Sequence, residues 1–223
     1  MEEAQNYTRW VLDQFRDEFG RSVLEVGIGH GGYSNHMPPG VHYWGLDLEA
    51  ASVAAARKKY PQREFFCADI TAPDFVAKHM HLQPDSILCA NVIEHIENDR
   101  LAVGNLLRLL APGRQLLLLV PALPALYNDL DRLAGHHRRY TKARLLEAIP
   151  ADFGTVRTLR YFNSIGALGW YANKFKRHDN IGDQAVSAQV RFFDRYVLPI
   201  SRGVDKLIGG SFGQSLIAIV QKS

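Results

Sequence analysis

Several features that would place a protein in a particular class are scarce or missing in this chain of 223 residues. It has two cysteines, Cys67 and Cys89, and both fall in segments that we expect to form core strands. We therefore expect no disulfide and a reduced, cytoplasmic location. No run of about 18 apolar residues occurs, so we expect no transmembrane helix. The acidic, polar start does not have the pattern of a signal peptide.

Clusters of one charge and metal-ligand spacings are also scarce. The formal net charge is +3, and Lys and Arg form no long stripe, so we expect no nucleic-acid partner. The nine histidines form no H-x-x-x-H pair, and we expect no metal. The length suits one globular domain, which we expect to be a monomer or a homodimer.

Apolar runs and helical periodicity alternate along most of the chain. Residues 4–19 predict an amphipathic helix, with Trp10, Val11, Phe15 and Phe19 at helical spacing. Strands are predicted at 23–26, 43–47, 64–67, 86–90 and 115–120, with helices at 33–37, 49–59, 73–81 and 99–110 between them. A helix at 141–149 and strands at 155–161 and 213–220 follow, with helix and loop over 162–212. Such alternation predicts an α/β fold whose mostly parallel sheet has helices on both faces.

The most informative segment is V-L-E-V-G-I-G-H-G-G-Y at residues 23–33. Glycines at a strand end let the backbone turn tightly and let a ligand approach the main-chain N–H groups. The spacing contains the dinucleotide fingerprint G-x-G-x-x-G, but Glu25 would face a pyrophosphate unfavourably. A ligand with an ammonium and a sulfonium suits this carboxylate better, so a dehydrogenase is the weakest interpretation.

Polar side chains end three more of the predicted strands. Asp47 lies 18 residues after Gly29, where a carboxylate can accept hydrogen bonds from both hydroxyls of a ribose. Asp69 and Asn91 end the third and fourth strands. Ligands of open α/β sheets bind beyond the carboxyl ends of the strands, so we expect one cofactor to lie along these residues.

In this order and spacing, these elements resemble the class I S-adenosylmethionine-dependent methyltransferases. The fifth strand, A-P-G-R-Q-L-L-L-L-V-P at 111–121, continues the likeness. The resemblance implies a Rossmann-like, seven-stranded, mostly parallel sheet whose last strand inserts antiparallel between strands five and six. It implies S-adenosyl-L-methionine as cofactor, with Asp69 at the adenine amino group and the backbone N–H of Ile70 at a ring nitrogen. The other expected cofactor-binding residues are Glu25, Gly27, Gly29, Gly31, Tyr33, Asp47, Leu48, Asn91 and His95.

The resemblance covers nearly the whole chain and therefore predicts a single domain over residues 1–223. Within it we expect an N-terminal cap helix (1–20), a cofactor-binding core (21–121), a substrate-side loop with helices (122–212) and the last strand (213–223). The segment G-H-H-R-R-Y at 135–140 is similar to a G-H-x-R-R-Y loop found in a subgroup of these enzymes.

The segment 127–141 follows the most buried strand and is polar, aromatic and basic, so we expect it to face the acceptor. His136 is the first candidate base, because an imidazole titrates near neutral pH; alternatively, it bonds Asp131 and holds the loop. Tyr127 and Arg138 are the other candidate catalytic residues. We expect Arg138 and Arg139 to bind an acidic substrate or to pair with Asp129 and Asp131, and we favour pairing for at least one.

We predict a methyltransferase that acts on an oxygen or nitrogen of a small molecule by in-line displacement. Two alternatives stay open at this point. The same site would serve a cyclase or alkyl transferase that releases methylthioadenosine, because a fold does not fix a reaction. The chain would also serve as a non-catalytic, cofactor-binding partner subunit. Aromatic residues over 161–175 predict a partly apolar acceptor pocket or a packed cap.

Overall fold

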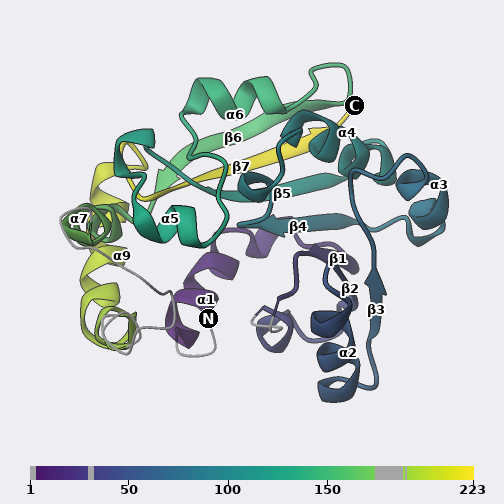
Figure 1. Cartoon of the computed structure of the whole chain (residues 1–223), viewed down its shortest axis with the longest axis horizontal. Coiled ribbons are helices and arrows are strands. Elements are labelled where there is room, and N and C mark those ends of the chain that lie inside the picture. Colours follow the sequence, from purple (N-terminus) through teal and green to yellow (C-terminus); the bar gives the residue numbers. More distant parts are fainter. Residues whose placement is uncertain (1–3, 30–32, 174–187, 189) are drawn as a thin grey trace.

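The computed structural model describes residues 4–29, 33–173, 188 and 190–223, and its centre is one seven-stranded sheet (Figure 1). The spatial order is β3-β2-β1-β4-β5-β7-β6. Strands β1 to β5 run parallel, and β7 pairs antiparallel with both β5 and β6. This confirms the predicted fold class. The strands are β1 (Ser22–Val26), β2 (His42–Asp47), β3 (Glu64–Cys67), β4 (Ser86–Ala90), β5 (Gln115–Pro121), β6 (Gly154–Phe162) and β7 (Ser215–Lys222).

Helices cover both faces of the sheet (Figure 1). One face carries α3 (Phe75–His79), α4 (Asp99–Leu109) and α6 (Lys142–Ala148). The other carries α1 (Gln5–Asp13), α2 (Ala50–Lys59) and α9 (Leu198–Ile208). The short α5 (Asp129–Leu133) and α7 (Ser164–Asn173) lie near the β6–β7 side of the sheet. None of the helices among the described residues is long and apolar enough to cross a membrane.

The continuous apolar run of β5 follows from this two-sided cover. Leu116, Leu118 and Val120 pack into the cluster under α3, α4 and α6. Leu117 and Leu119 pack into the cluster under α1 and α2. Successive side chains of a strand point to opposite faces, so both sets are buried and the sequence shows no apolar–polar alternation.

The local structure differs from the sequence prediction in four places. The helix predicted at 4–19 ends at Asp13 and is followed by a 3₁₀ turn, Arg16–Glu18. The helix predicted at 33–37 is only a 3₁₀ turn, Ser34–His36, because two prolines follow at 38–39 and cannot donate backbone hydrogen bonds. Helix α5 was not predicted. Cys67 is exposed rather than in the core, since it ends β3, the edge strand.

Candidate active site

A cleft of about 600 Å³ opens at the carboxyl ends of β1 to β4. This volume lies within the range of small-molecule sites. Eight of the residues predicted to bind the cofactor line this cleft: Gly27, Gly29, Asp47, Leu48, Asp69, Ile70, Asn91 and His95. They come from four segments far apart in the sequence, and the parallel strands bring them to one edge of the sheet. Gly31 lies outside the described residues.

Two glycines of the loop after β1 serve different purposes. Gly27 has φ +77°, and a Cβ there would lie 2.3 Å from Cγ2 of Val92, so packing against the turn after β4 excludes any side chain. Gly29 has φ +48°, and a Cβ there would meet nothing within 4 Å. The open space beside Gly29 belongs to the cleft. A ligand in this cleft therefore has direct access to the backbone at Gly29.

Asp47 connects the end of β2 to this glycine loop. Its Oδ2 accepts a hydrogen bond from the backbone N–H of Gly29 at 2.8 Å, and its Oδ1 accepts one from the N–H of Glu49 at 2.9 Å. Each carboxylate oxygen has a second lone pair. The carboxylate is thus held in place by the protein and can still accept hydrogen bonds from a ligand.

The ends of β3 and β4 are also fixed by local interactions. Oδ1 of Asp69 accepts hydrogen bonds from both the N–H and the hydroxyl of Thr71, each at 2.7 Å. The carbonyl of Ile70 accepts a bond from the Asn105 amide of α4 at 2.8 Å. Asn91 has φ +54°, a left-handed conformation that is uncommon for residues other than glycine and is often found at functional sites. This turn at Asn91 leads the chain back over the cleft.

Glu25 and Tyr33, also predicted to bind the cofactor, are buried and are not among the cleft-lining residues. The Tyr43 hydroxyl donates to Oε2 of Glu25 at 2.9 Å, whereas Oε1 has no hydrogen-bond partner among the described residues. Burial raises the pKa of Glu25 to about 8, against the opposing effects of the Tyr43 hydrogen bond and the Arg63 charge. The Tyr33 hydroxyl likewise has no partner in the described part of the chain. Glu25 thus lies behind the glycine loop rather than in the cleft, with one carboxyl oxygen that no described residue bonds.

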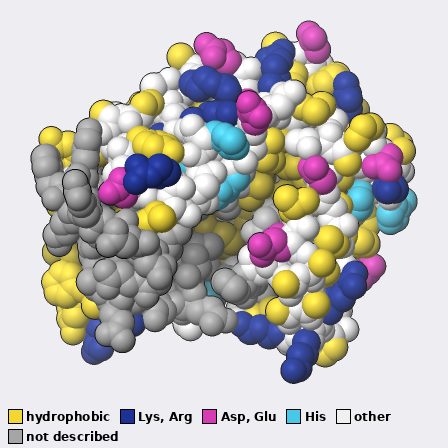
Figure 2. Space-filling view, viewed as in Figure 1, with side chains coloured by type: hydrophobic (Ala, Val, Ile, Leu, Met, Phe, Trp, Pro, Cys, Tyr) yellow, Lys and Arg dark blue, Asp and Glu magenta, His cyan; other side chains and the backbone are white. Residues whose placement is uncertain are grey.

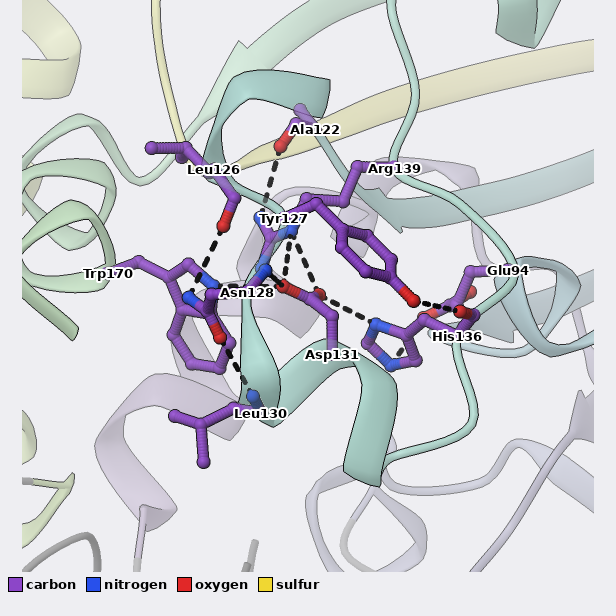
Figure 3. Close-up of polar contacts among 10 residues, drawn as sticks. All are labelled: Glu94, Ala122, Leu126, Tyr127, Asn128, Leu130, Asp131, His136, Arg139 and Trp170. Atoms are coloured by element: carbon purple, nitrogen blue, oxygen red, sulfur yellow. Dashed lines mark hydrogen bonds and ion pairs between the residues drawn. The ribbon is translucent and has the colours of Figure 1, made fainter. Parts of the chain in front are cut away.

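A second group of polar residues centres on Asp131 of α5 (Figure 3). Its side chain is fully buried. Oδ2 accepts from the N–H of Asn128, which completes a capping box at the start of the helix. Arg139 donates from Nε to both oxygens at 2.9 and 3.0 Å, and the Trp170 indole donates at 3.3 Å. Burial raises the pKa of Asp131, but hydrogen bonds from His136 and Arg139 outweigh it, so the net pKa is lowered and the group is ionised.

His136 lies between Asp131 and Glu94 (Figure 3). Its Nδ1 is 2.8 Å from Oδ1 of Asp131. Because Asp131 is an ionised acceptor, we assign the imidazole proton to Nδ1, which leaves the lone pair on Nε2. Nε2 lies 4.0 Å from Oε1 of Glu94. The hydrogen bond to Asp131 that the second alternative expects is thus present, and the role of His136 as a base stays a prediction, with Nε2 turned towards Glu94.

Tyr127 and Arg138 bind the protein's own backbone. The Tyr127 hydroxyl donates to the carbonyl of His136 at 2.8 Å. Arg138 donates to the carbonyls of Ile96 and Glu97 at 2.7 and 2.9 Å, and it also forms an ion pair with Asp99 at 3.0 Å. Both side chains have the geometry of positioning residues: Tyr127 joins two parts of the 127–141 segment, and Arg138 holds that segment against the turn after β4.

The pairing that we expected with Asp129 or Asp131 occurs for Arg139, whereas Arg138 pairs with a different aspartate. Arg139 pairs with Asp131 and Arg138 pairs with Asp99. Asp129 instead pairs with Arg132 within α5 at 2.8 Å.

Sequence reasoning gave no role to Glu94, which is buried beside His136. The side chain is 0% exposed, and neither carboxylate oxygen accepts a hydrogen bond from the described residues. Its neighbour His95 is exposed and lines the cleft, with its ring centre 4.7 Å from that of His136. Burial, together with the adjacent His136, lowers the pKa of His95. The signal in the sequence is the E-H dipeptide just past a strand end.

A second cavity, of about 590 Å³ and with a mostly apolar lining, adjoins the Asp131 group. Leu130, next to Asp131 in the chain, and Trp170, its indole donor, both line it. Other lining residues come from α1, α7 and the π-helical turn Phe193–Val197. The part of the 161–175 segment that the structure describes, which ends at residue 173, therefore contributes to a pocket through Trp170 and its neighbours in α7.

Comparisons with known proteins show which family this chain resembles. The profile of a family described as a methyltransferase domain matches residues 2–171. The chain is 30% identical over 180 residues to a "probable S-adenosylmethionine-dependent methyltransferase" of Mycolicibacterium smegmatis, covering 77% of this chain and 64% of that protein. It is 25% identical over 171 residues to a ubiquinone biosynthesis O-methyltransferase of Cronobacter sakazakii, covering 72% and 63%. The chain thus spans less than two thirds of the length of these relatives.

A solved structure extends the likeness to the fold. It is the N-methyltransferase NodS from Bradyrhizobium japonicum WM9 in complex with S-adenosyl-L-homocysteine. The TM-score is 0.57 at 14% identity, covering 97% of this chain and 85% of that one. At this identity the similarity concerns the fold alone.

Proposed function

Because this chain belongs to the class I S-adenosylmethionine-dependent methyltransferases, we propose that it transfers a methyl group to an oxygen or nitrogen of a small molecule. The observation that carries the proposal is the cleft at the carboxyl ends of β1 to β4. Its edge holds the carboxylates of Asp47 and Asp69, and Glu25 lies buried behind the glycine loop. Such a row of acids suits a ribose, an adenine amino group and a cationic amino-acid end.

The residues present fit the cofactor. S-adenosylmethionine supplies, when bound, a methyl group on a sulfonium that is open to in-line displacement. Asp47 would accept from the ribose hydroxyls, while Asp69 and the N–H of Ile70 would meet the adenine. The open space beside Gly29 would receive the amino-acid end, with Glu25 buried behind the glycine loop. Alignment of donor and acceptor by such contacts contributes about 7–11 kcal/mol to rate enhancement.

On the acceptor side, we assign the proton-accepting role to the Asp131–His136 pair. Asp131 holds the imidazole with its Nε2 lone pair available, and a base of this kind assists when the acceptor is a hydroxyl. The apolar cavity behind Leu130 and Trp170 suits an acceptor with an apolar or aromatic part. The relative named as an O-methyltransferase supports an oxygen acceptor.

Calorimetry and product analysis test the proposal. We expect S-adenosylhomocysteine to bind the full chain and NADH to give no heat. With labelled S-adenosylmethionine and a panel of phenolic and amine acceptors, we expect S-adenosylhomocysteine and a methylated acceptor as products. Release of methylthioadenosine would instead show cyclisation, and tight cofactor binding without turnover on any acceptor would show a non-catalytic subunit. Either outcome would overturn the proposed transfer.

A further inference from the structure

The side chains of Glu94, His95 and His136 form a cluster at the rim of the cleft. One donor atom from each lies within 4.8 Å of the other two. Glu94 and His95 belong to the 3₁₀ turn after β4 (Ile93–His95), and His136 follows α5. Figure 2 shows histidine side chains near the middle of this face, beside a hollow. Two separate segments of the chain thus converge here.

The carboxylate of Glu94 is the least satisfied group of this cluster. It is fully buried, and neither oxygen has a hydrogen-bond partner among the residues that the structure describes. Buried carboxyl groups are normally hydrogen-bonded, paired with a cation or bound to a metal. Nε2 of His136 lies 4.0 Å from Oε1 of Glu94, too far for a hydrogen bond. This geometry leaves space for an ion between the two side chains.

His136 has the supporting contacts that metal-bound histidines have. A metal-ligating imidazole usually donates its other N–H to a carboxylate, which fixes the tautomer and the ring orientation. Asp131 accepts from Nδ1 of His136 at 2.8 Å and is itself held by Arg139. Nε2 of His136 consequently carries its lone pair on the side of Glu94. Asp131 is a positioning residue in this arrangement.

We propose that Glu94, His95 and His136 bind a divalent transition-metal ion at the rim of the cleft. Two imidazoles and one carboxylate suit Zn²⁺, Mn²⁺, Fe²⁺ or Co²⁺, whereas Mg²⁺ and Ca²⁺ prefer oxygen ligands. Three protein ligands leave at least one coordination position open. Because His95 lines the cleft, that position faces it. The sequence expectation of no metal rested on spacing within single segments, and these ligands come from two.

A bound ion would restrict which compounds can serve as the methyl acceptor. This step rests on the proposed methyl transfer. A bound divalent ion lowers the pKa of a hydroxyl that coordinates to it, so a phenol or catechol would release its proton to solvent water. Its oxygen would then form the new bond to the methyl carbon as the bond from that carbon to sulfur breaks, and S-adenosylhomocysteine would leave. With an ion bound, the lone pair on Nε2 of His136 coordinates the ion and can no longer accept a proton from the methyl acceptor. The ion then promotes the loss of that proton in place of the imidazole. The acceptor class is accordingly a hydroxyl compound that can coordinate a metal.

Metal titration of the full chain tests the site without any methyl transfer. After EDTA treatment and its removal, we expect the wild type to take up one equivalent of Zn²⁺, or of Co²⁺ with a change in visible absorption. Glu94→Gln and His95→Ala remove ligands, so each should lower the affinity by more than the roughly 10–100-fold typical of losing an outer partner. Asp131→Asn should fall within that range. The matched control is His137→Ala, which removes an exposed neighbouring histidine and should change nothing.

Two results would overturn the site: no uptake by the wild type, or unchanged affinity in both ligand variants. Should Glu94→Gln fail to fold, the exposed His95 gives the decisive variant, because its truncation leaves no buried gap. Calorimetry with S-adenosylhomocysteine in EDTA separates this proposal from the proposed function. Cofactor binding without metal uptake rejects only the metal site, and metal uptake without cofactor binding rejects only the methyltransferase activity.

Discussion

The backbone N–H of Gly29 donates a 2.8 Å hydrogen bond to Oδ2 of Asp47. This bond joins two sequence motifs that lie 18 residues apart, the glycine loop after β1 and the acid that ends β2. The carboxylate therefore has two tasks, because it orders the loop and offers lone pairs to a ligand in the cleft.

Asp47→Ala should weaken binding of S-adenosylhomocysteine by a few kcal/mol. The reason is the loss of two hydrogen bonds to a charged acceptor, at about 1.5–3 kcal/mol each, together with looser packing of the Gly29 loop. Calorimetry measures the dissociation constant, with Asp152→Ala, a change at an exposed loop residue, as the control. An unchanged constant in a folded Asp47→Ala protein would remove this residue from the cofactor site.

Gly29→Val should abolish detectable cofactor binding. The new side chain would enter the open space of the cleft, and the positive φ would add strain of about 1–2 kcal/mol. Gly40→Val is a matched control, because Gly40 also has a positive φ and open space around it but lies in an exposed turn. Both variants should lose similar thermal stability, and only Gly29→Val should lose affinity. Equal affinity in the two variants would place the cofactor elsewhere.

His136→Ala should lower turnover about 10²–10⁴-fold while cofactor affinity stays nearly intact, the usual range for lost proton transfer. The physical reason is the removal of the Nε2 lone pair that Asp131 holds in place. Steady-state kinetics of the variant and of the control His137→Ala provide the comparison. Joint loss of thermal stability and cofactor affinity would show a purely structural role. Wild-type turnover would contradict both roles.

Glu25→Gln should change how stability depends on pH. Burial raises the pKa of Glu25 to about 8, against an ordinary value of 4.5, with Tyr43 and Arg63 opposing this and Asp47 adding to it. The folded state therefore binds this proton more tightly than the unfolded state does. Its contribution to stability is complete below about pH 4.5 and is lost as pH rises through 8.

Glutamine mimics the neutral carboxyl group, so Glu25→Gln should be more stable than the wild type above pH 8, by an amount on the order of a few kcal/mol. Chemical denaturation at a series of pH values measures this difference. Glu147→Gln, a change at an exposed carboxyl group, should keep the wild-type pH profile. Parallel profiles for the wild type and Glu25→Gln would mean that Glu25 is already ionised in the folded protein.

Much of the sheet could be predicted because its pattern is local. Each strand end among Asp47, Asp69 and Asn91 is marked by an apolar run that stops at a polar residue. The turn at 34–36 was overestimated because helical periodicity does not register the two prolines that follow it. Helix α5 was not predicted because it is too short to show helical periodicity. The capping box between Asn128 and Asp131 stabilises it instead.

The candidate site was only partly predictable, because burial and long-range pairing leave little trace in the sequence. Glu94 looks like an ordinary polar residue in a loop, although the structure buries it completely. Asp131 collects donors from Arg139, eight residues away, and from Trp170, 39 residues away. The ion pair of Arg138 with Asp99 joins the segment after α5 to the first residue of α4, 39 residues earlier in the chain. The spacing of residues within one segment does not predict such contacts between separate segments.

The position of β7 determines when the last part of the sheet can form during synthesis. Strands β1 to β5 pair with one another through segments already made when β5 is complete, whereas β6, among the strands that the structure describes, pairs only with β7. Residues 154–162 therefore have no strand partner until residues 215–222 have left the ribosome. During that interval one edge of β5 is open, and open edges invite pairing with other chains. Late closure of this edge by a distant segment predicts a slow final folding step and a transient vulnerability to aggregation during synthesis.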